Sequence, residues 1–125
     1  MKVVDASVVV ELVAGDLAPD RLGDEELAVP HLLDSEVTHA LRSLVFRGVL
    51  TDAQGAMALE GFIGLALTRF SVQELRLRMW ALRHNLSGYD AAYVALAETI
   101  GATSLLTTDA RLARAPGIHC RVDVL

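Results

Sequence analysis

Four acidic residues stand where their carboxylates can do chemistry. Asp5 closes a short apolar stretch near the start of the chain, and Asp109 follows a second one, SLLT. Asp90 opens the most apolar predicted helix, and Glu36 lies near the edge of another helix's apolar stripe, about 60° from Leu33 on a helical wheel. Clustered carboxylates repel one another unless a cation compensates them. Oxygen-only ligands favour Mg²⁺, or Mn²⁺, which can orient water and stabilise charge during phosphoryl transfer.

Each of these acids also has a purely structural explanation. Asp90 fits the last position of an S-x-x-D capping box that begins at Ser87. Asp109 fits the N-cap of a following helix, and Glu36 suits the first turns of a helix. Asp5 is the hardest to explain this way, because an acid within VVDASVVV has no evident need for solvent. Taken one at a time, the structural explanations are the stronger ones except at Asp5.

The elements that must position these acids alternate between short apolar strands and helices. The predicted strands are residues 2–5, 27–29, 69–72, 104–107 and 120–122. The predicted helices are residues 31–47, 51 or 52 to about 66, 73–85, 88–100 and 110–115. Residues 7–14, SVVVELVA, are ambiguous, because three consecutive valines favour a strand by propensity. The alternation predicts an α/β sandwich around a mostly parallel sheet, in which ligands bind beyond the carboxyl ends of the strands.

Four segments carry most of the specific information: DASVVV at 5–10, PHLLDSEVTHAL at 30–41, YDAAYVALAE at 89–98 and LLTTDARL at 105–112. Their order and spacing resemble the PIN-domain ribonucleases, and most closely the VapC toxins of bacterial toxin–antitoxin pairs. The resemblance spans nearly the whole chain. YDAAYVALAE is its most specific segment, whereas DASV alone is a weak signal.

The resemblance implies a single PIN domain over residues 1–125, folded as a PIN-like three-layer α/β/α sandwich. It also implies a magnesium-dependent endoribonuclease that acts as the toxin of a toxin–antitoxin pair. It carries over an acidic quartet of catalytic residues: Asp5, Glu36, Asp90 and Asp109. By resemblance Asp5 and Asp90 are the main Mg²⁺ ligands and Asp109 completes the metal pocket. Glu36 acts on the metal directly or through water.

Three further positions are interpreted through the same resemblance. Ser7 and Thr107 match small hydroxyl positions that hydrogen-bond the carboxylates of the pocket. His39 departs from the family, which often has an asparagine there. Because it follows Glu36 by three residues, it leans toward the rim of the pocket, and we interpret it as a tolerated polar neighbour rather than a catalytic group.

The expected partners are an RNA substrate, a cognate antitoxin protein and a second copy of the chain. Arg76, Arg78 and Arg83 are candidates for contacts with RNA phosphates, although an arginine-bearing helix face is more often simply solvated. The predicted helices over residues 31–66 carry more apolar side chains than one small core needs. This excess suggests an exposed surface for an antitoxin or for a homodimer.

Composition sets the remaining limits. A chain of 125 residues with 53% hydrophobic residues has the size and apolar content of one folded domain. The lone Cys120 excludes an internal disulfide or a multi-cysteine zinc site and fits a reducing compartment, so we expect a cytoplasmic protein. No apolar run reaches 18 residues, so we expect no membrane partner.

The net charge of −5 is unevenly distributed. Residues 1–60 hold four basic and eleven acidic side chains, whereas residues 61–125 hold seven and five. Segment 16–26 contributes −4 and the quartet another −4, so the rest of the chain carries +3. The acidic composition therefore does not exclude binding to RNA.

Two alternatives stay open. An aspartate-based phosphotransfer domain would also place Asp5 after a first strand, but Ser7 stands where a dehalogenase-type phosphatase has a second Asp, and the only lysine is Lys2. A catalytically inactive, PIN-like module that only binds a partner would have a broken quartet, and here all four acids are present. No phosphate-binding loop, zinc-protease motif or serine-hydrolase motif occurs.

Overall fold

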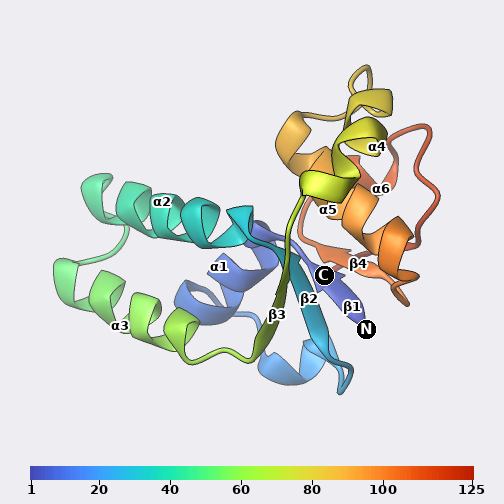
Figure 1. Cartoon of the computed structure of the whole chain (residues 1–125). Helices are drawn as coiled ribbons and strands as arrows, with labels where there is room; N and C mark the ends of the chain where they lie inside the picture. The colour runs from blue at the N-terminus through green and yellow to red at the C-terminus, as the bar shows by residue number, and fades with distance from the viewer.

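The computed structural model describes all residues 1–125 and is built around a five-stranded sheet (Figure 1). The strands are β1 (Lys2–Val4), β2 (Leu27–Pro30), β3 (Leu67–Phe70), β4 (Leu105–Thr107) and β5 (Val122–Val124). Their order is β3-β2-β1-β4-β5, and every neighbouring pair is parallel. β1 is therefore central, which is why Val3 and Val4 are buried. The expected parallel sheet is confirmed.

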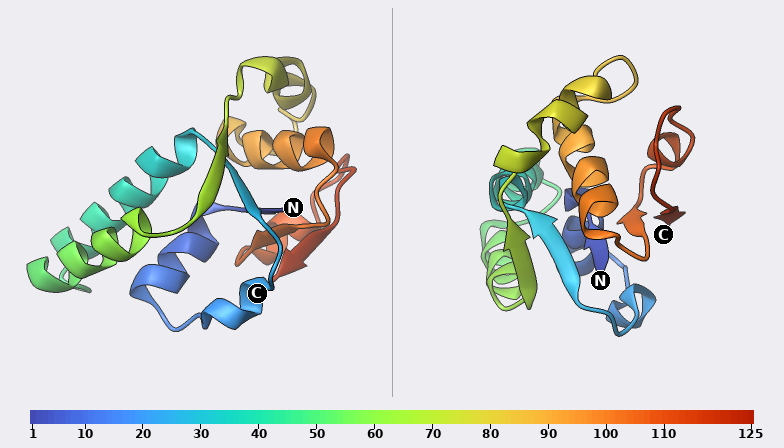
Figure 2. Two further views of the ribbon diagram at one scale, coloured as in Figure 1. Left: turned by 60° about the horizontal axis from the view of Figure 1, so that its bottom comes forward. Right: turned by 45° about the vertical axis from the view of Figure 1, so that its right-hand side comes forward.

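Helices cover both faces of the sheet and complete a three-layer α/β/α sandwich (Figure 2). They are α1 (Ala6–Ala14), α2 (Leu32–Phe46), α3 (Asp52–Ile63), α4 (Arg76–Ala81), α5 (Gly88–Ile100) and α6 (Ala110–Ala113). Two 3₁₀ turns, η1 (Pro19–Leu22) and η2 (Gln73–Leu75), lie in the connections. α1 packs with α2 and α3, whereas α5 packs with α4 and lies along β1, β2 and β4.

The strand order places a topological switch beside β1. The sheet grows from β1 through β2 to β3, and the chain then returns past β1 to add β4 and β5. Because crossovers between parallel strands are right-handed, this reversal puts the connecting helices on the opposite face. The carboxyl ends of β1 and β4 meet at the reversal, which is where open α/β sheets bind ligands.

α1 resolves the ambiguous SVVVELVA segment as a helix. The Asp5 side chain caps it by accepting a hydrogen bond from the backbone N–H of Val8. Val8 and Val9 are buried against the core, at 0% and 1% exposure. Capping and burial of one helix face therefore outweigh the strand propensity of the three valines.

The prediction of a single amphipathic helix over residues 73–85 is wrong. The segment divides into η2, the six-residue α4, and turns up to Asn85. Neither η2 nor α4 begins with a side-chain cap, and none of the six residues of α4 is buried. The flanking Leu75 and Leu82 are buried in the core, at 4% and 2% exposure, whereas Met79 of α4 packs against it only partly buried. A helix without caps and without a buried face has little to stabilise a longer run.

Two strands begin at other residues than the sequence predicts, because their bounds are set by pairing with a neighbouring strand. The third strand begins at Leu67 rather than at residue 69, because Leu67 pairs with Leu27 of β2. The last strand begins at Val122 rather than at residue 120, because Val122 pairs with Leu105 of β4. Both shifts follow from hydrogen-bonded register, which short apolar segments do not reveal.

α5 forms the centre of the core on its face of the sheet. Every residue from Ala91 to Ala97 is buried, in line with the apolar character of this segment on all sides. Gly101 ends the helix in the left-handed conformation, with φ of 63°. None of the helices is both long and apolar enough to cross a membrane.

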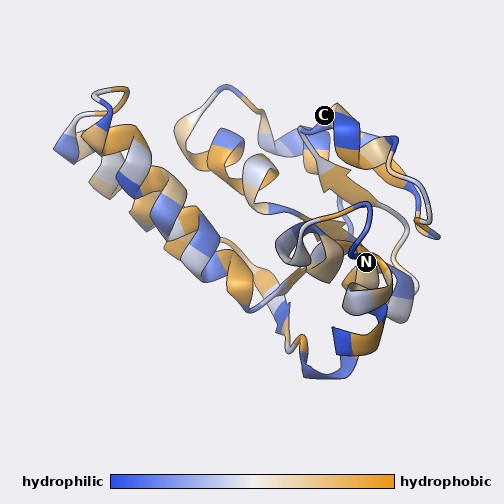
Figure 3. Ribbon diagram, turned by 90° about the horizontal axis from the view of Figure 1, so that it is seen from above, coloured by the Kyte–Doolittle hydropathy of each residue, from blue (hydrophilic) through white to orange (hydrophobic).

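α2 and α3 extend beyond the sheet as an antiparallel pair (Figure 2), and apolar residues recur along this arm (Figure 3). Gly55 permits their close approach, since a Cβ there would lie 2.6 Å from Val45 Cγ2. Phe46, Met57 and Ile63 remain 74%, 72% and 73% exposed. This arm therefore carries the apolar surface expected from the composition of residues 31–66.

Candidate active site

Asp5 is held at the carboxyl end of β1 through both of its carboxylate oxygens. Ser7 Oγ donates to Oδ1 at 2.5 Å, and the Val8 N–H donates to the same oxygen at 3.1 Å. Thr107 Oγ1, at the end of β4, donates to Oδ2. A carboxylate has about four acceptor positions, so these bonds leave about one free. Asp5 is 7% exposed and is therefore an oriented, largely buried acid.

Ser7 and Thr107 connect Asp5 to the loop that carries Asp109. Ser7 Oγ accepts a hydrogen bond from the Thr108 N–H, and Thr107 Oγ1 accepts one from the Asp109 N–H, both at 3.0 Å. Each hydroxyl thus donates to Asp5 and accepts from the loop after β4. The structure brings these two hydroxyls and two of the four acids together across the switch between β1 and β4.

Asp90 and Asp109 line one surface pocket of about 290 Å³. α5 leads into β4, so its first turn, with Asp90, lies at the carboxyl edge of the sheet. Asp90 donates its backbone N–H to Ser87 Oγ at 3.1 Å, which closes the cap of α5. The cap uses the backbone of Asp90 and not its carboxylate. The structural explanation of Asp90 therefore does not compete with a functional one.

Glu36 reaches the site from α2 and is fixed by Tyr93 of α5. The buried Tyr93 hydroxyl donates to Glu36 Oε1 at 2.6 Å. Burial raises the pKa of Glu36, the Tyr93 hydrogen bond opposes this change, and the charges of Asp90 and Asp5 raise the pKa further. The net effect is a pKa above the ordinary value, and the contributions of Asp90 and Asp5 mean that Glu36 interacts electrostatically with both acids.

Asp90 and Asp109 have pKa values displaced in opposite directions. Burial raises the pKa of Asp90, and the charges of Asp5 and Asp109 raise it further. By contrast, the Arg111 guanidinium donates to both oxygens of Asp109, at 3.2 and 3.3 Å, and lowers the pKa of that carboxyl. The pocket thus combines a poorly compensated carboxylate with one that is paired to arginine.

The four acids suit a hard divalent cation although they do not form a closed cage. No three Asp, Glu, His or Cys side chains are grouped closely enough to hold a metal ion by themselves. Mg²⁺ commonly takes one or two carboxylates and keeps several waters, so it does not require a cage. The donors are all oxygen, and a cation would relieve the repulsion that raises the pKa values of Glu36 and Asp90.

Two residues of the site are absent from the sequence-based set. Tyr93 follows Asp90 by three residues, and its hydroxyl stands out within a helix segment that is otherwise apolar. That signal could have indicated a polar partner, because a buried Tyr hydroxyl is usually hydrogen-bonded. Arg111 follows Asp109 by two residues, and its backbone N–H donates to the Asp109 carboxylate that caps α6. A sequence alone does not tell whether such an arginine folds back onto its neighbour.

The three candidate arginines do not lie together. Arg76 and Arg83 line one groove beside the start of α5. Arg78 instead forms a bidentate ion pair with Glu98, at 2.7 and 3.0 Å, and donates to the carbonyl oxygen of Gly117. Arg78 therefore stabilises the packing of α4 against α5 and the C-terminal segment.

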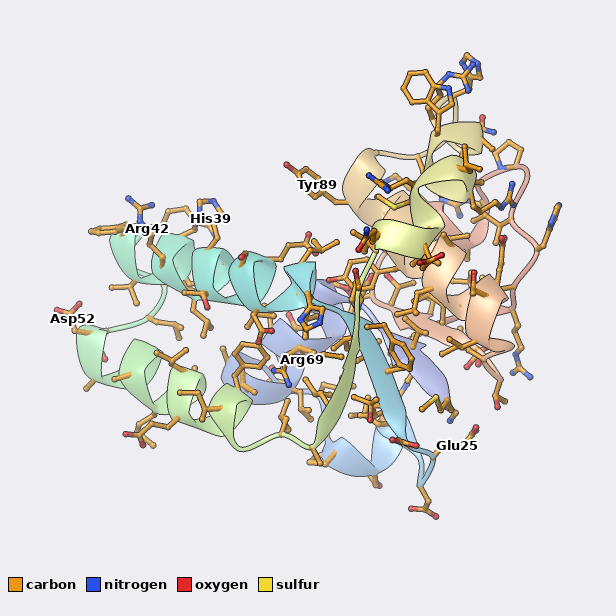
Figure 4. The ribbon with its side chains drawn as sticks, in the orientation of Figure 1. Glu25, His39, Arg42, Asp52, Arg69 and Tyr89 are labelled. Carbon is orange, nitrogen blue, oxygen red and sulfur yellow. The ribbon has the colours of Figure 1, made fainter.

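His39 lies on an exposed part of α2, on the same side as Arg42 (Figure 4). It lines a shallow surface hollow with Asp34, Ser35, Thr38 and Arg42. None of the four acids lines that hollow. His39 is thus an exposed polar residue of α2, and the structure does not place it at the rim of the pocket lined by Asp90 and Asp109.

Comparison with known proteins identifies the family. The PIN domain family model matches residues 2–118. Among curated relatives, ribonuclease VapC9 of Mycobacterium tuberculosis is 43% identical over 100% of this chain and 98% of the relative. Ribonuclease VapC1 of the same species is 40% identical over 98% of this chain and 96% of the relative.

Solved structures share the fold of this chain. PAE2754 of Pyrobaculum aerophilum superposes with a TM-score of 0.73 at 25% identity, covering 98% of this chain and 83% of its own. VapC20 of Mycobacterium tuberculosis, described as a toxin that cleaves the sarcin–ricin loop, shares the fold with a TM-score of 0.67 at 16% identity, over 91% of this chain and 94% of its own. The chain therefore belongs to the PIN-domain family and, within it, to the VapC ribonucleases.

Proposed function

We propose that this VapC ribonuclease hydrolyses RNA phosphodiester bonds at the site formed by Asp5, Glu36, Asp90 and Asp109, with Mg²⁺ as its cofactor. The observation that carries the proposal is the convergence of acids from separate elements at one edge of the sheet. Burial raises the pKa values of Glu36 and Asp90, and the charges of the neighbouring acids raise them further. Unfavourable charge concentrated at a topological switch is typical of a functional site.

Asp5, Asp90 and Asp109 are the residues that would hold Mg²⁺, and Mn²⁺ would satisfy the same oxygen donors. When bound, the ion would act as a Lewis acid that lowers the pKa of a water molecule and offsets the negative charge of the phosphate. Asp5 suits this role because its hydrogen bonds with Ser7 and Thr107 fix its orientation. Preoriented ligands reduce the cost of assembling the site.

Glu36 and Arg111 supply chemistry on the protein side. Tyr93 occupies only Oε1 of Glu36, so Oε2 is free to accept a hydrogen bond from the attacking water. The Arg111 side chain is 86% exposed at the mouth of the pocket, where its guanidinium can donate to a phosphate oxygen. These two residues therefore orient the water and stabilise the negative charge of the phosphate.

The proposal includes a cognate antitoxin and a cytoplasmic location for the toxin. The exposed apolar surface of the α2–α3 arm, with Phe46, Met57 and Ile63, supports contact with an antitoxin or with a second copy of the chain. A homodimer is the expected state. Size-exclusion chromatography with light scattering, on the wild type and on Met57→Glu, tests the dimer: the variant becomes monomeric if this surface mediates it.

Cleavage assays on purified protein test the catalytic site. Asp90→Asn keeps the backbone N–H that donates to the Ser87 cap of α5 and removes the charge, so the protein stays folded and loses cleavage. Asp24→Asn is the matched control, because Asp24 is exposed and makes no hydrogen bond through its side chain. Chelation with EDTA abolishes wild-type cleavage, and added Mg²⁺ restores it. Full activity of Asp90→Asn would overturn the assignment.

A further inference from the structure

A second groove adjoins the carboxylate pocket and has a different lining. It measures about 510 Å³ and lies along α4 and the following turn. Arg76, Met79, Trp80 and Arg83 line it, at the spacing that places residues on one face of a helix. Its far end is formed by Leu86 and Ser87, and both of these also line the pocket that contains Asp90 and Asp109. The two depressions are therefore contiguous.

Trp80 is the most unusual residue of this groove. It is the only tryptophan of the chain, and it is 67% exposed. The Arg83 guanidinium carbon lies 4.5 Å from the centre of the Trp80 ring, stacked over one face. Arg83 also donates to the carbonyl oxygen of Trp80 at 3.0 Å, which fixes the pair. A large, oriented and solvated π surface is a platform on which a nucleobase can stack.

The charge of the groove complements a phosphate backbone. Neither Arg76 nor Arg83 forms an ion pair, and no acid lines the groove. Arg78 on the same short helix shows the contrast, because its charge is compensated by Glu98. Two uncompensated guanidinium groups thus flank an exposed aromatic ring next to a catalytic pocket. This combination is typical of proteins that bind single-stranded nucleic acid.

We propose that Trp80 stacks on an unpaired base of the RNA while Arg76 and Arg83 bind the adjoining phosphates, so that the strand enters the carboxylate pocket past Ser87. The inference rests on the proposed RNA cleavage and adds a subsite that selects unpaired nucleotides. A base within a duplex has both faces stacked on its neighbours and cannot cover the ring. The platform therefore favours loops and single-stranded segments over helices.

The lone tryptophan provides a direct readout that is independent of cleavage. A short single-stranded RNA is titrated into the folded Asp90→Asn protein while the fluorescence of Trp80 is recorded. Stacking quenches the emission, whereas the same RNA as a duplex, or with an abasic nucleotide at the stacked position, leaves it nearly unchanged. Quenching by RNA at low salt that does not depend on the presence of a base would contradict stacking.

The RNA affinity of substituted proteins completes the test and is measured by the fluorescence anisotropy of a labelled RNA. Trp80→Ala weakens binding of single-stranded RNA by about 5- to 150-fold, and Trp80→Phe restores much of the loss because it keeps an aromatic face. Leu77→Ala is the matched control, since Leu77 is an 88% exposed residue of the same helix that lies outside the groove. Circular dichroism establishes that each variant is folded.

The outcomes separate this inference from the proposed function. If the wild type cleaves RNA but Trp80→Ala binds and cleaves as well as the wild type does, the stacking platform is wrong and the catalytic assignment stands. If a protein partner quenches Trp80 while RNA does not, the groove is a protein-binding surface and the inference fails. If the wild type cleaves no RNA with Mg²⁺ or Mn²⁺, the proposed function itself fails.

Discussion

Tyr93→Phe tests whether Glu36 acts as an ionised carboxylate. The Tyr93 hydroxyl donates to Glu36 Oε1 at 2.6 Å and lowers the pKa of Glu36 against the effects of burial and of the charges of Asp90 and Asp5. A hydrogen bond to a charged group contributes about 1.5–3 kcal/mol when buried. Because Glu36 is only half-buried, solvent screening reduces this to about 1 kcal/mol, which is about a fivefold change in the protonation equilibrium.

The substitution therefore moves the acid limb of the kcat/KM profile toward higher pH. At pH values on the acid limb, kcat/KM of the variant is about fivefold lower than that of the wild type. Near pH 8 the two values of kcat/KM are equal. The assay is cleavage of a fluorogenic RNA between about pH 5 and pH 9. Tyr89→Phe is the control, because the Tyr89 side chain is 67% exposed and makes no hydrogen bond. Equal loss at every pH, or no loss, would refute the role given to ionised Glu36.

Three further outcomes follow from the same contacts. The raised pKa of Glu36 means that its charge destabilises the folded state as the pH rises through that pKa, so Glu36→Gln raises the Tm at pH 7 by about 2–4 °C and leaves it unchanged at about pH 3. Arg78→Ala removes the ion pair that, despite the opposing effect of burial, holds the pKa of Glu98 below its ordinary value. It therefore costs about 1–3 kcal/mol in urea unfolding at pH 7 and less as the pH falls through the pKa of Glu98. Removing Arg76 or Arg83 lowers the salt slope of single-stranded RNA binding by about 0.7 each, whereas Arg78→Ala leaves the slope unchanged.

Elements with strong local signals were predictable from the sequence. The segment YDAAYVALAE is apolar all round and is capped by Ser87 and Gly101, and α5 extends from Gly88 to Ile100 as expected. The segment after Asp5 was ambiguous because its helix depends on a cap and on burial rather than on propensity. Residues 73–85 were misjudged because spacing reports which side chains share a face, not whether the backbone there has caps to sustain a helix.

Part of the candidate site was likewise predictable from the sequence and part was not. The four acids were predictable as candidates because strand ends and helix starts meet at one edge of a parallel sheet. The contact between Tyr93 and Glu36 was not predictable, since it joins residues 57 positions apart in the chain. The pairing of Arg78 with Glu98 depends likewise on how α4 packs against α5. Such tertiary contacts separate a structural arginine from one that is available to a ligand.

The hydrogen bonds of the acids also determine which substitution removes activity without destabilising the fold. Asp5 accepts hydrogen bonds from Ser7, Val8 and Thr107, so Asp5→Ala removes a helix cap and a link between β1 and β4 together with the charge. Such a variant would confuse loss of folding with loss of catalysis. The backbone N–H of Asp90 donates to the Ser87 cap of α5, and asparagine keeps this N–H. Asp90→Asn is therefore the variant in which catalysis and stability separate.

Mapping of newly formed RNA ends in cells tests the central claim most directly. The wild type and Asp90→Asn are induced at equal levels, and the 5′ ends of total RNA are sequenced. We expect new ends at discrete sites in unpaired RNA with the wild type and none with Asp90→Asn. The same ends from both proteins, or none from the folded wild type without its antitoxin, would contradict the assignment of RNA cleavage to these carboxylates.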